Sequence, residues 1–322
     1  MINKNFITSV ILVFITFKTQ SLYAQQDAQY TQYMYNTISV NPAYAGSRGQ
    51  LSMAALYRTQ WVGLDGAPKT FTLNLHSPIR NSRLGYGVSV VNDAIGDGTV
   101  AETYFDGDVS YTIDVGQDKK LSFGVKIGGK MFNLDYSKLQ QRTDGGGTEP
   151  SFGDNIDNRF NINFGAGVYY HTSKFYAGLS IPNFLETEHF DNSKQNDDSS
   201  PFLSKERLNL YFITGYVFDI GSDLKFKPAF LTKAVQGAPL QLDFSASFMF
   251  NNKFTFGAAY RWDAALSGLV GFQINDQLAV GLAYDKETTD LGGTQFNNGS
   301  FEIFLRLELV KSFKKLVSPR FF

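Results

Sequence analysis

Residues 101–113 read AETYFDGDVSYTI, and this stretch decides the fold because its side chains alternate between two chemical faces. The more apolar face carries Thr103, Phe105, Val109, Tyr111 and Ile113. The polar face carries Glu102, Tyr104, Asp106, Asp108 and Ser110. Alternation with a period of two residues is the pattern of a β-strand whose two faces meet different surroundings. The stretch therefore predicts one strand of a sheet that is apolar on one side only.

The same alternation recurs beyond residue 48 and predicts about fourteen strands. They are expected at 50–58, 69–77, 84–92, 100–113, 120–133, 160–171, 174–181, 205–219, 223–233, 239–250, 253–262, 266–274, 277–285 and 299–309. A soluble β-sandwich would alternate too, but these polar faces carry full charges and glycines, as a wet lumen tolerates. The apolar faces are rich in Phe and Tyr, as the interfacial girdles of a membrane barrel require. The sequence therefore predicts an all-β fold, a single transmembrane antiparallel β-barrel.

The predicted connections alternate in length, which is a second sign of an outer-membrane barrel. The short ones fall near 78–83, 114–119, 172–173, 220–222, 251–252 and 275–276. The long ones fall at 59–68, 134–159, 182–204 and 286–298. Outer-membrane barrels have short periplasmic turns and longer outside loops. We therefore expect an integral protein of the cell outer membrane with both termini in the periplasm. Pro228 removes a ladder donor and predicts a bulge or a strand end within 223–233.

The composition excludes several classes of protein. The 322 residues carry 29 Lys and Arg against 30 Asp and Glu, without the basic excess of a nucleic-acid-binding protein. The sequence contains no cysteine, which excludes disulfides and thiolate metal sites. Charged residues make up 18%, below the roughly 25% of soluble domains, while aromatic residues make up 15%. These values fit strands that face lipid on one side and a polar lumen on the other.

The first residues have the pattern of a secretory signal peptide. Lys4 is positively charged, residues 7–17 form an apolar core, and a cleavage site follows Ala24. We expect four parts, namely a signal peptide 1–24, an N-terminal segment 25–49, a barrel 50–309 and a short periplasmic C-terminal tail 310–322. The N-terminal segment is aromatic and rich in amides, so we expect it to pack in or under the barrel or against a partner.

No residue pattern indicates catalysis. The three histidines are His76, His171 and His189, and none has a neighbour at metal-ligand spacing. We therefore predict no enzyme activity, no catalytic residue, no cofactor and no metal. The inward faces of two adjacent predicted strands carry Glu102, Asp106, Asp108, Lys126 and Lys130. These charges predict either ion pairs that stiffen the wall or a polar pathway through the lumen.

Both ends of the expected mature chain resemble a known family. The first stretch is Asp27-x-Gln29-Tyr30-x-Gln32-Tyr33-Met34-Tyr35-Asn36, followed by Asn41-Pro42-Ala43-Tyr44-Ala45-Gly46-Ser47. The second is Tyr57-Arg58-x-Gln60-Trp61-Val62-Gly63, followed by Gly66-Ala67-Pro68-x-Thr70. The sequence closes on Ser318-Pro319-Arg320-Phe321-Phe322. These motifs resemble the PorP/SprF family, and the resemblance spans nearly the whole of the expected mature chain.

The resemblance implies an outer-membrane barrel of the type IX secretion system of Bacteroidota. Some family members associate with periplasmic ring and motor parts of the machine. The SprF-like members support secretion of one cognate partner, often a very large surface adhesin used in gliding. Such a partner carries a distinct C-terminal sorting domain. We therefore expect a non-enzymatic component that supports secretion or surface anchoring of an adhesin-like protein. Its other partners would be outer-membrane lipid and periplasmic secretion components.

The residues expected to serve structure or docking lie in these motifs. They are Gln32, Tyr33, Asn36, Asn41, Pro42, Tyr44, Arg58, Gln60, Trp61, Pro319 and Arg320. Arg58 has inward parity, and we expect its guanidinium to hydrogen-bond carbonyls of the packed N-terminal segment. We expect Trp61 to pack on Pro68.

Two alternatives stay open at this point. The basic tail 310–322 is either a solvated end beside lipid headgroups or a docking tail for assembly or secretion components. The rival function for the whole chain is a passive porin or a transport channel for hydrophobic substrates, which the wide lumen of about fourteen strands permits.

Overall fold

The computed structural model of the chain describes residues 30–135, 137–140, 155–185, 207–236, 238–294 and 297–309. Its strands are β1 Leu51–Thr59, β2 Lys69–Pro78, β3 Leu84–Ile95, β4 Val100–Gly116, β5 Lys119–Leu134, β6 Ile156–His171, β7 Phe175–Ile181, β8 Asn209–Tyr216, β9 Phe218–Asp219, β10 Leu224–Val235, β11 Gln241–Phe250, β12 Phe254–Arg261, β13 Ala265–Gln273, β14 Leu278–Glu287 and β15 Ser300–Leu309. The short helices are η1 Tyr33–Tyr35, α2 Thr37–Val40, η2 Pro42–Tyr44, α3 Ser137–Gln140 and η3 Asp290–Gly293. None of these helices is long and apolar enough to cross a membrane.

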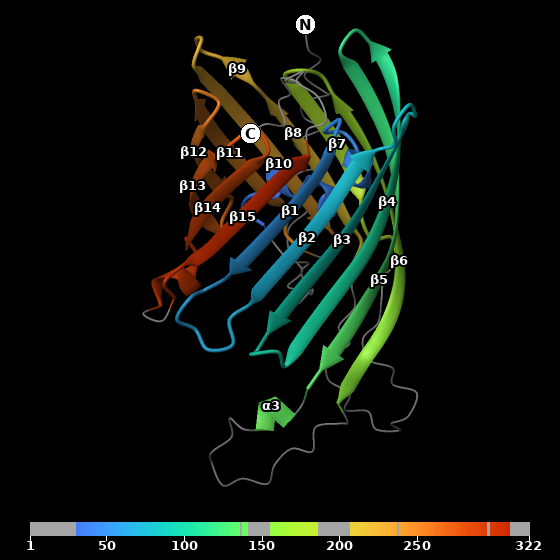
Figure 1. Ribbon diagram of the computed structural model, residues 1–322. Helices are drawn as coiled ribbons and strands as arrows, with labels where there is room; N and C mark the ends of the chain where they lie inside the picture. Colours follow the sequence, from blue (N-terminus) through green and yellow to red (C-terminus); the bar gives the residue numbers. More distant parts are fainter. Residues whose placement is uncertain are drawn as a thin grey trace, which may run out of the picture.

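All fifteen strands belong to one antiparallel sheet that closes on itself (Figure 1). The first strand, β1, pairs along its whole length with the last strand, β15, and β10 pairs with β11. β9 has only two residues and continues β8 along the same partner, β10. The sheet is therefore a closed barrel of fourteen strands with one short extra strand. This confirms the predicted fold.

The predicted strand 205–219 and the prediction for Pro228 both need correction. The expected strand divides at Val217 into β8 and β9. Pro228 neither ends β10 nor shifts its register, because it stays paired with Ala246 of β11. The pairs with β8 and β9 instead skip residues 227 and 228. A proline cannot donate to the ladder, so it weakens pairing with one neighbour while the other neighbour keeps the strand in place.

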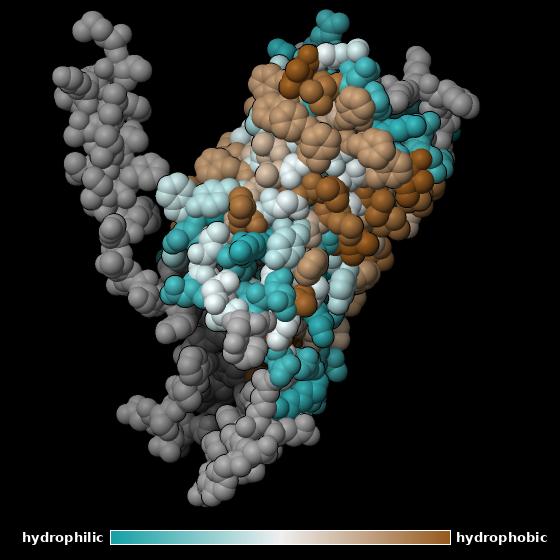
Figure 2. Space-filling view, turned by 90° about the vertical axis from the view of Figure 1, so that its left-hand side faces the viewer, coloured by the Kyte–Doolittle hydropathy of each residue, from teal (hydrophilic) through white to brown (hydrophobic). Residues whose placement is uncertain are grey.

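The outward faces of the strands form an apolar surface. Val88, Val125, Ile127, Phe160 and Leu282 are each more than half exposed. Exposed aromatic residues gather near the strand ends, with Tyr57, Phe71, Tyr284 and Phe301 at one end and Tyr86, Tyr111, Phe123 and Phe254 at the other. Figure 2 shows apolar residues over one side of the wall, with hydrophilic residues toward the ends. A belt of this kind between aromatic girdles suits the hydrocarbon layer of a membrane.

The two ends of the barrel differ in loop length. At the short-turn end the connections are 79–83, 117–118, 172–174, 220–223, 251–253 and 274–277. At the long-loop end they include 60–68, 135–155, 182–208 and 288–299. The long-loop end, where α3 lies, points downward in Figure 1. All the long connections therefore lie at one end, as predicted, although the connections 96–99, 236–240 and 262–264 at that end are short.

The N-terminal residues 30–48 lie inside the barrel, where Figure 1 shows them in blue behind the front wall. They include η1, α2 and η2. We call residues 30–48 the plug. The expected signal peptide 1–24, His189 and the tail 310–322 lie outside the described residues.

Candidate functional site

The plug packs an apolar core against one side of the lumen. The plug contributes Tyr33, Ile38, Val40, Ala43, Tyr44 and Ala45, and the wall contributes Tyr169, Tyr176, Tyr211, Ile213 and Leu231. These wall residues come from β6, β7, β8 and β10. Burial raises the pKa of the Tyr33 phenol far above its usual value, so this group stays neutral. Hydrophobic burial therefore fixes the plug inside the barrel much as it fixes the core of a soluble protein.

Glycines in the wall let the plug backbone come close. A Cβ at Gly124 on β5 would lie 2.2 Å from the backbone nitrogen of Ala43. A Cβ at Gly167 on β6 would lie 2.2 Å from Oδ1 of Asn41. Asn41 is held there because its Oδ1 accepts the Ala43 N–H at 3.0 Å and its Nδ2 donates to the Val168 carbonyl at 3.1 Å. The wall is thus shaped to receive the Asn-Pro turn of the plug.

A buried charged pair holds the plug at the short-turn end. Arg48 forms an ion pair with Glu308, the next-to-last residue of β15. Gln50 Nε2 donates to the other oxygen of Glu308 at 2.5 Å. The Gly46 N–H donates to Nδ1 of His76 at 3.2 Å. We call Arg48 and Glu308 the short-turn anchor.

At the long-loop end, three charged wall residues hold the beginning of the plug. Arg58 Nη1 lies 2.5 Å from Asp285 Oδ2 and 3.4 Å from Glu302 Oε2. Glu302 accepts the backbone N–H groups of Thr31 at 2.9 Å and Gln32 at 2.8 Å. The Thr31 hydroxyl donates to Asp285 at 2.5 Å and accepts from Arg58 at 2.9 Å. We call Arg58, Asp285 and Glu302 the Arg58 clamp; their side chains are at most 1% exposed.

The prediction that Arg58 hydrogen-bonds carbonyls of the N-terminal segment is wrong. Its guanidinium binds two carboxylates and the Thr31 hydroxyl. A plug carbonyl is bound by a different arginine, since Arg261 Nη2 donates to the backbone carbonyl oxygen of Tyr30 at 3.3 Å. A guanidinium buried this deeply is stabilised far better by carboxylates than by neutral carbonyls.

Aromatic and amide contacts hold the plug between its two ends. The Tyr35 ring stacks on Phe304 with ring centroids 3.9 Å apart. The guanidinium carbon of Arg306 lies 5.3 Å from the centroid of the Tyr35 ring. Asn74 Nδ2 donates to Asn36 Oδ1 at 2.8 Å. The plug is therefore attached to the wall along its whole described length.

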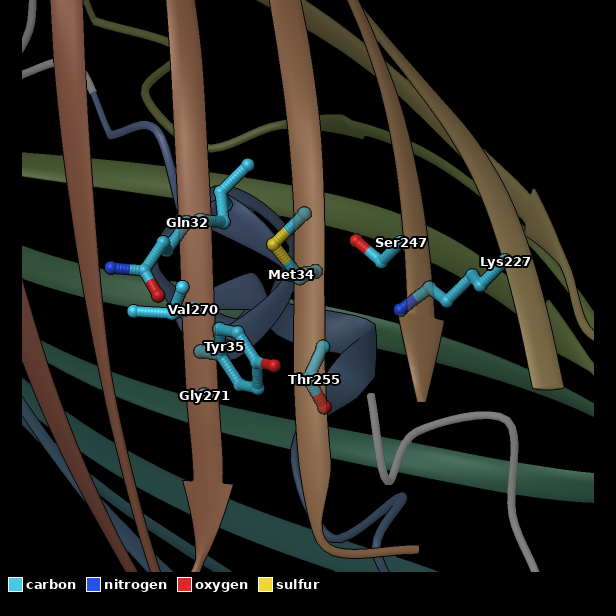
Figure 3. A pocket seen from close by; sticks show the side chains of 9 residues that line it. Gln32, Met34, Tyr35, Lys227, Ser247, Thr255, Val270 and Gly271 are labelled. Atoms are coloured by element: carbon cyan, nitrogen blue, oxygen red, sulfur yellow. The ribbon is translucent and has the colours of Figure 1, made fainter. Parts of the chain in front are cut away.

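Two small cavities lie in the described part of the barrel. Figure 3 shows a cavity between the plug and the wall of β10 to β13. It is lined by Gln32, Met34 and Tyr35 from the plug and by Lys227, Ser247 and Thr255 from the wall, among others. Its volume is about 10 Å³, room for about one water molecule. A second cavity of about 10 Å³ lies against the inner faces of β4 to β6. Neither cavity admits a solute larger than water.

The inward charges of β4 and β5 form the predicted ion pairs. Lys130 Nζ lies 3.0 Å from Glu102, and Lys126 Nζ lies 3.3 Å from Asp106. Both oxygens of the buried Asp108 lack a hydrogen-bond partner in the described part of the chain. No group of three potential metal ligands occurs among the described residues.

The structure brings together most of the residues singled out from the sequence. Gln32, Tyr33, Asn36, Asn41, Pro42 and Tyr44 lie in the plug, and Arg58 contacts it. Gln60 and Trp61 lie apart from it, in the loop after β1. There the Gln60 N–H donates to the Pro68 carbonyl at 2.9 Å, and Trp61 Nε1 donates to Glu287 at 3.1 Å. Packing of Trp61 on Pro68 stays a prediction, and Pro319 and Arg320 lie outside the described residues.

Sequence reasoning misses four residues of the clamp and the anchor, and it also misses Thr31 of the plug, which the clamp binds. The four are Arg48, Asp285, Glu302 and Glu308. Glu302 and Glu308 do carry a signal, because they are charges at inward positions of a last strand whose outward positions are apolar. The position of a residue in the alternating pattern shows that its side chain faces the lumen. It does not show which group the side chain contacts there.

A family model described as type IX secretion system membrane protein PorP/SprF matches residues 22–307. The crystal structure of the Acinetobacter baumannii outer membrane protein Omp33 is 9% identical, with a TM-score of 0.46, over 81% of this chain and 98% of that chain. The crystal structure of the Ralstonia pickettii toluene transporter TbuX is 10% identical, with a TM-score of 0.48, over 86% of this chain and 92% of that chain. No curated protein matches the chain. Identities this low concern the fold alone.

Proposed function

The chain belongs to the PorP/SprF family of type IX secretion system membrane proteins, and on this premise we propose that it serves one secreted partner as a plugged outer-membrane platform. Membership makes it a membrane component of that secretion system. The proposed partner is an adhesin-like protein with a type IX C-terminal sorting domain. The platform supports secretion of this partner or anchors it at the surface for adhesion or gliding.

One observation carries the proposal: the plug lies inside the lumen and is attached to the wall at both ends. A porin needs an open aqueous lumen, and a hydrophobic-substrate channel needs a cavity large enough for its substrate. Among the described residues, the cavity between the plug and β10 to β13 holds about 10 Å³, and so does the cavity against β4 to β6. A barrel that holds an attached plug is better suited to bind a protein than to pass solutes.

The proposal includes an orientation in the outer membrane. Short turns face the periplasm in barrels of this kind, and longer loops face outward. Leu309 ends β15 at the short-turn end, so the C-terminal tail would begin in the periplasm, within reach of periplasmic secretion components. Tyr30 contacts Arg261, the last residue of β12, at the long-loop end. The Arg58 clamp would therefore face the side on which a secreted partner emerges.

Gene deletion tests the proposal. The gene is deleted in its host, and the surface amount of the adhesin-like protein encoded nearest to it is measured together with the amount of an unrelated type IX substrate. We expect loss of the first protein from the surface, retention of the second, and recovery of both when the gene is restored. Unchanged surface display of every type IX substrate in the deletion strain contradicts the proposed function.

A further inference from the structure

We propose that the Arg58 clamp is a binding site for an extended polypeptide, which the plug fills until a segment of the secreted partner replaces it. This inference rests on the proposed function and adds to it the place and the chemistry of the contact. The ligand would be a stretch of chain with a serine or threonine and, next to it, an amide side chain.

The clamp recognises features that many polypeptides share. Glu302 accepts two successive backbone N–H groups, and every residue except proline offers such a group. Among the described residues of the plug, the one side-chain group that the clamp binds is the hydroxyl of Thr31, which lies between Arg58 and Asp285. A segment from another protein that carries a hydroxyl at this place would make the same bonds.

The clamp is built entirely from the wall. Its three charges come from the neighbouring strands β1, β14 and β15, and Arg58 pairs with both carboxylates without help from the plug. To the clamp, the described plug residues contribute only neutral groups, namely two backbone N–H groups and one hydroxyl. The site therefore keeps its charges paired when one polypeptide leaves and another enters, which is what exchange of ligands requires.

The plug leaves part of the clamp unused. Arg58 Nε and Asp285 Oδ1 have no hydrogen-bond partner in the described part of the chain. Both side chains are only 1% exposed, so water does not replace the missing partners. Ser267 lies opposite Asp285 in the sheet, and its hydroxyl is close to this carboxylate but does not meet hydrogen-bond geometry at Oδ1. A buried donor and a buried acceptor without partners are costly, so a ligand that satisfies both gains affinity over the plug.

A primary amide supplies the two missing groups. Its oxygen can accept from Arg58 Nε, and its NH₂ can donate to Asp285 Oδ1. Gln32 carries such an amide, but its Nε2 has no hydrogen-bond partner among the described residues, and its side chain lines the cavity on the side of β10 to β13 (Figure 3). The plug is thus an incomplete ligand of its own clamp, which a better ligand can displace.

Binding of a peptide probe tests the inference. The probe is a fluorescent copy of residues 30–36, YTQYMYN, and the protein is the full chain in lipid nanodiscs. Thr31→Ala removes the hydroxyl bonds of the plug, so we expect this variant to bind the probe about tenfold more tightly than the wild type. Adding Glu302→Gln to this variant abolishes binding, because the carboxylate that accepts two N–H groups is gone.

Glu102→Gln in the Thr31→Ala background is the matched control, since it removes a buried lumenal carboxylate that pairs with Lys130 away from the clamp. Binding that is equal in Thr31→Ala and the wild type, unaffected by Glu302→Gln, or absent from all variants overturns the inference. Circular dichroism and gel mobility are measured for each variant to check that it is folded. If gene deletion stops secretion of the partner while the probe fails to bind, only this inference fails. If deletion leaves secretion unchanged, the proposed function fails.

Discussion

The Glu302 carboxylate on β15 accepts the backbone N–H of Thr31 at 2.9 Å, across 271 positions of the sequence. This bond joins the start of the plug to the wall at the long-loop end. Arg48 and Glu308 join its other end to the same strand at the short-turn end. A segment attached twice to one strand is held along the lumen, and each attachment can be tested separately.

Arg58→Ala should destabilise the barrel strongly. The change leaves Asp285 and Glu302 buried without their cation, and breaking a buried ion pair in this way costs about 3–5 kcal/mol. The measurement is urea unfolding of the lipid-reconstituted protein, followed by tryptophan fluorescence. Lys69→Ala is the control, because it breaks an exposed ion pair. Lys69 pairs with Asp97, their side chains are 56% and 67% exposed, and such surface pairs contribute less than about 1 kcal/mol. Equal unfolding midpoints for the two variants would show that the clamp does not stabilise the fold.

Gly124→Ala should displace the plug and open a conducting path. The added Cβ would lie 2.2 Å from the nitrogen of Ala43, closer than side chains and backbone tolerate. Overpacking of this kind costs about 1–3 kcal/mol, which the plug can relieve by moving away from β5. Planar-bilayer recording should show rare or no conductance for the wild type and frequent openings for the variant.

Gly268→Ala is the control for this experiment, since a Cβ there meets nothing within 4 Å. It should conduct no more than the wild type. Steady conductance of the wild-type protein would instead favour a porin and contradict the proposed platform.

The sequence predicts the wall of the barrel well because the wall obeys local rules. Alternation in residues 101–113 places Asp106 and Asp108 inward and Phe105 and Val109 outward, as in β4. Successive side chains of a strand point to opposite faces whichever strand lies beside it. The two faces can therefore be predicted from the local sequence alone. Pro228 is the exception, because whether a proline ends a strand depends on which neighbour its missing N–H would have met.

The clamp cannot be predicted in the same way. Arg58 and Asp285 are 227 positions apart, and only closure of β1 on β15 brings their strands near each other. The family motif does mark Arg58, but it gives no partner for it. The prediction of a carbonyl partner for Arg58 failed because its true partners are two carboxylates on other strands. Asp285 and Glu302 can be assigned to Arg58 only when the register of β1, β14 and β15 is known.

Labelling of single cysteines should establish the orientation. The natural chain has no cysteine, so each introduced thiol is the sole target. Thr289 is exposed at the long-loop end, and Ser222 is exposed at the short-turn end. A membrane-impermeant maleimide should label Thr289→Cys in intact cells and Ser222→Cys only after the outer membrane is permeabilised. The reverse pattern would mean that the long loops face the periplasm.

The two attachments of the plug should open independently in hydrogen exchange. Glu302→Gln weakens the acceptor of the Thr31 and Gln32 N–H groups, so exchange at these two amides should rise about tenfold or more. His76→Phe removes the acceptor of the Gly46 N–H, so exchange should rise there and not at Thr31. Mass spectrometry of peptides that cover 30–36 and 44–50 separates the two regions. If either substitution releases both regions together, the plug opens as one unit, and a partner that competes for the clamp alone would have to expel the entire segment.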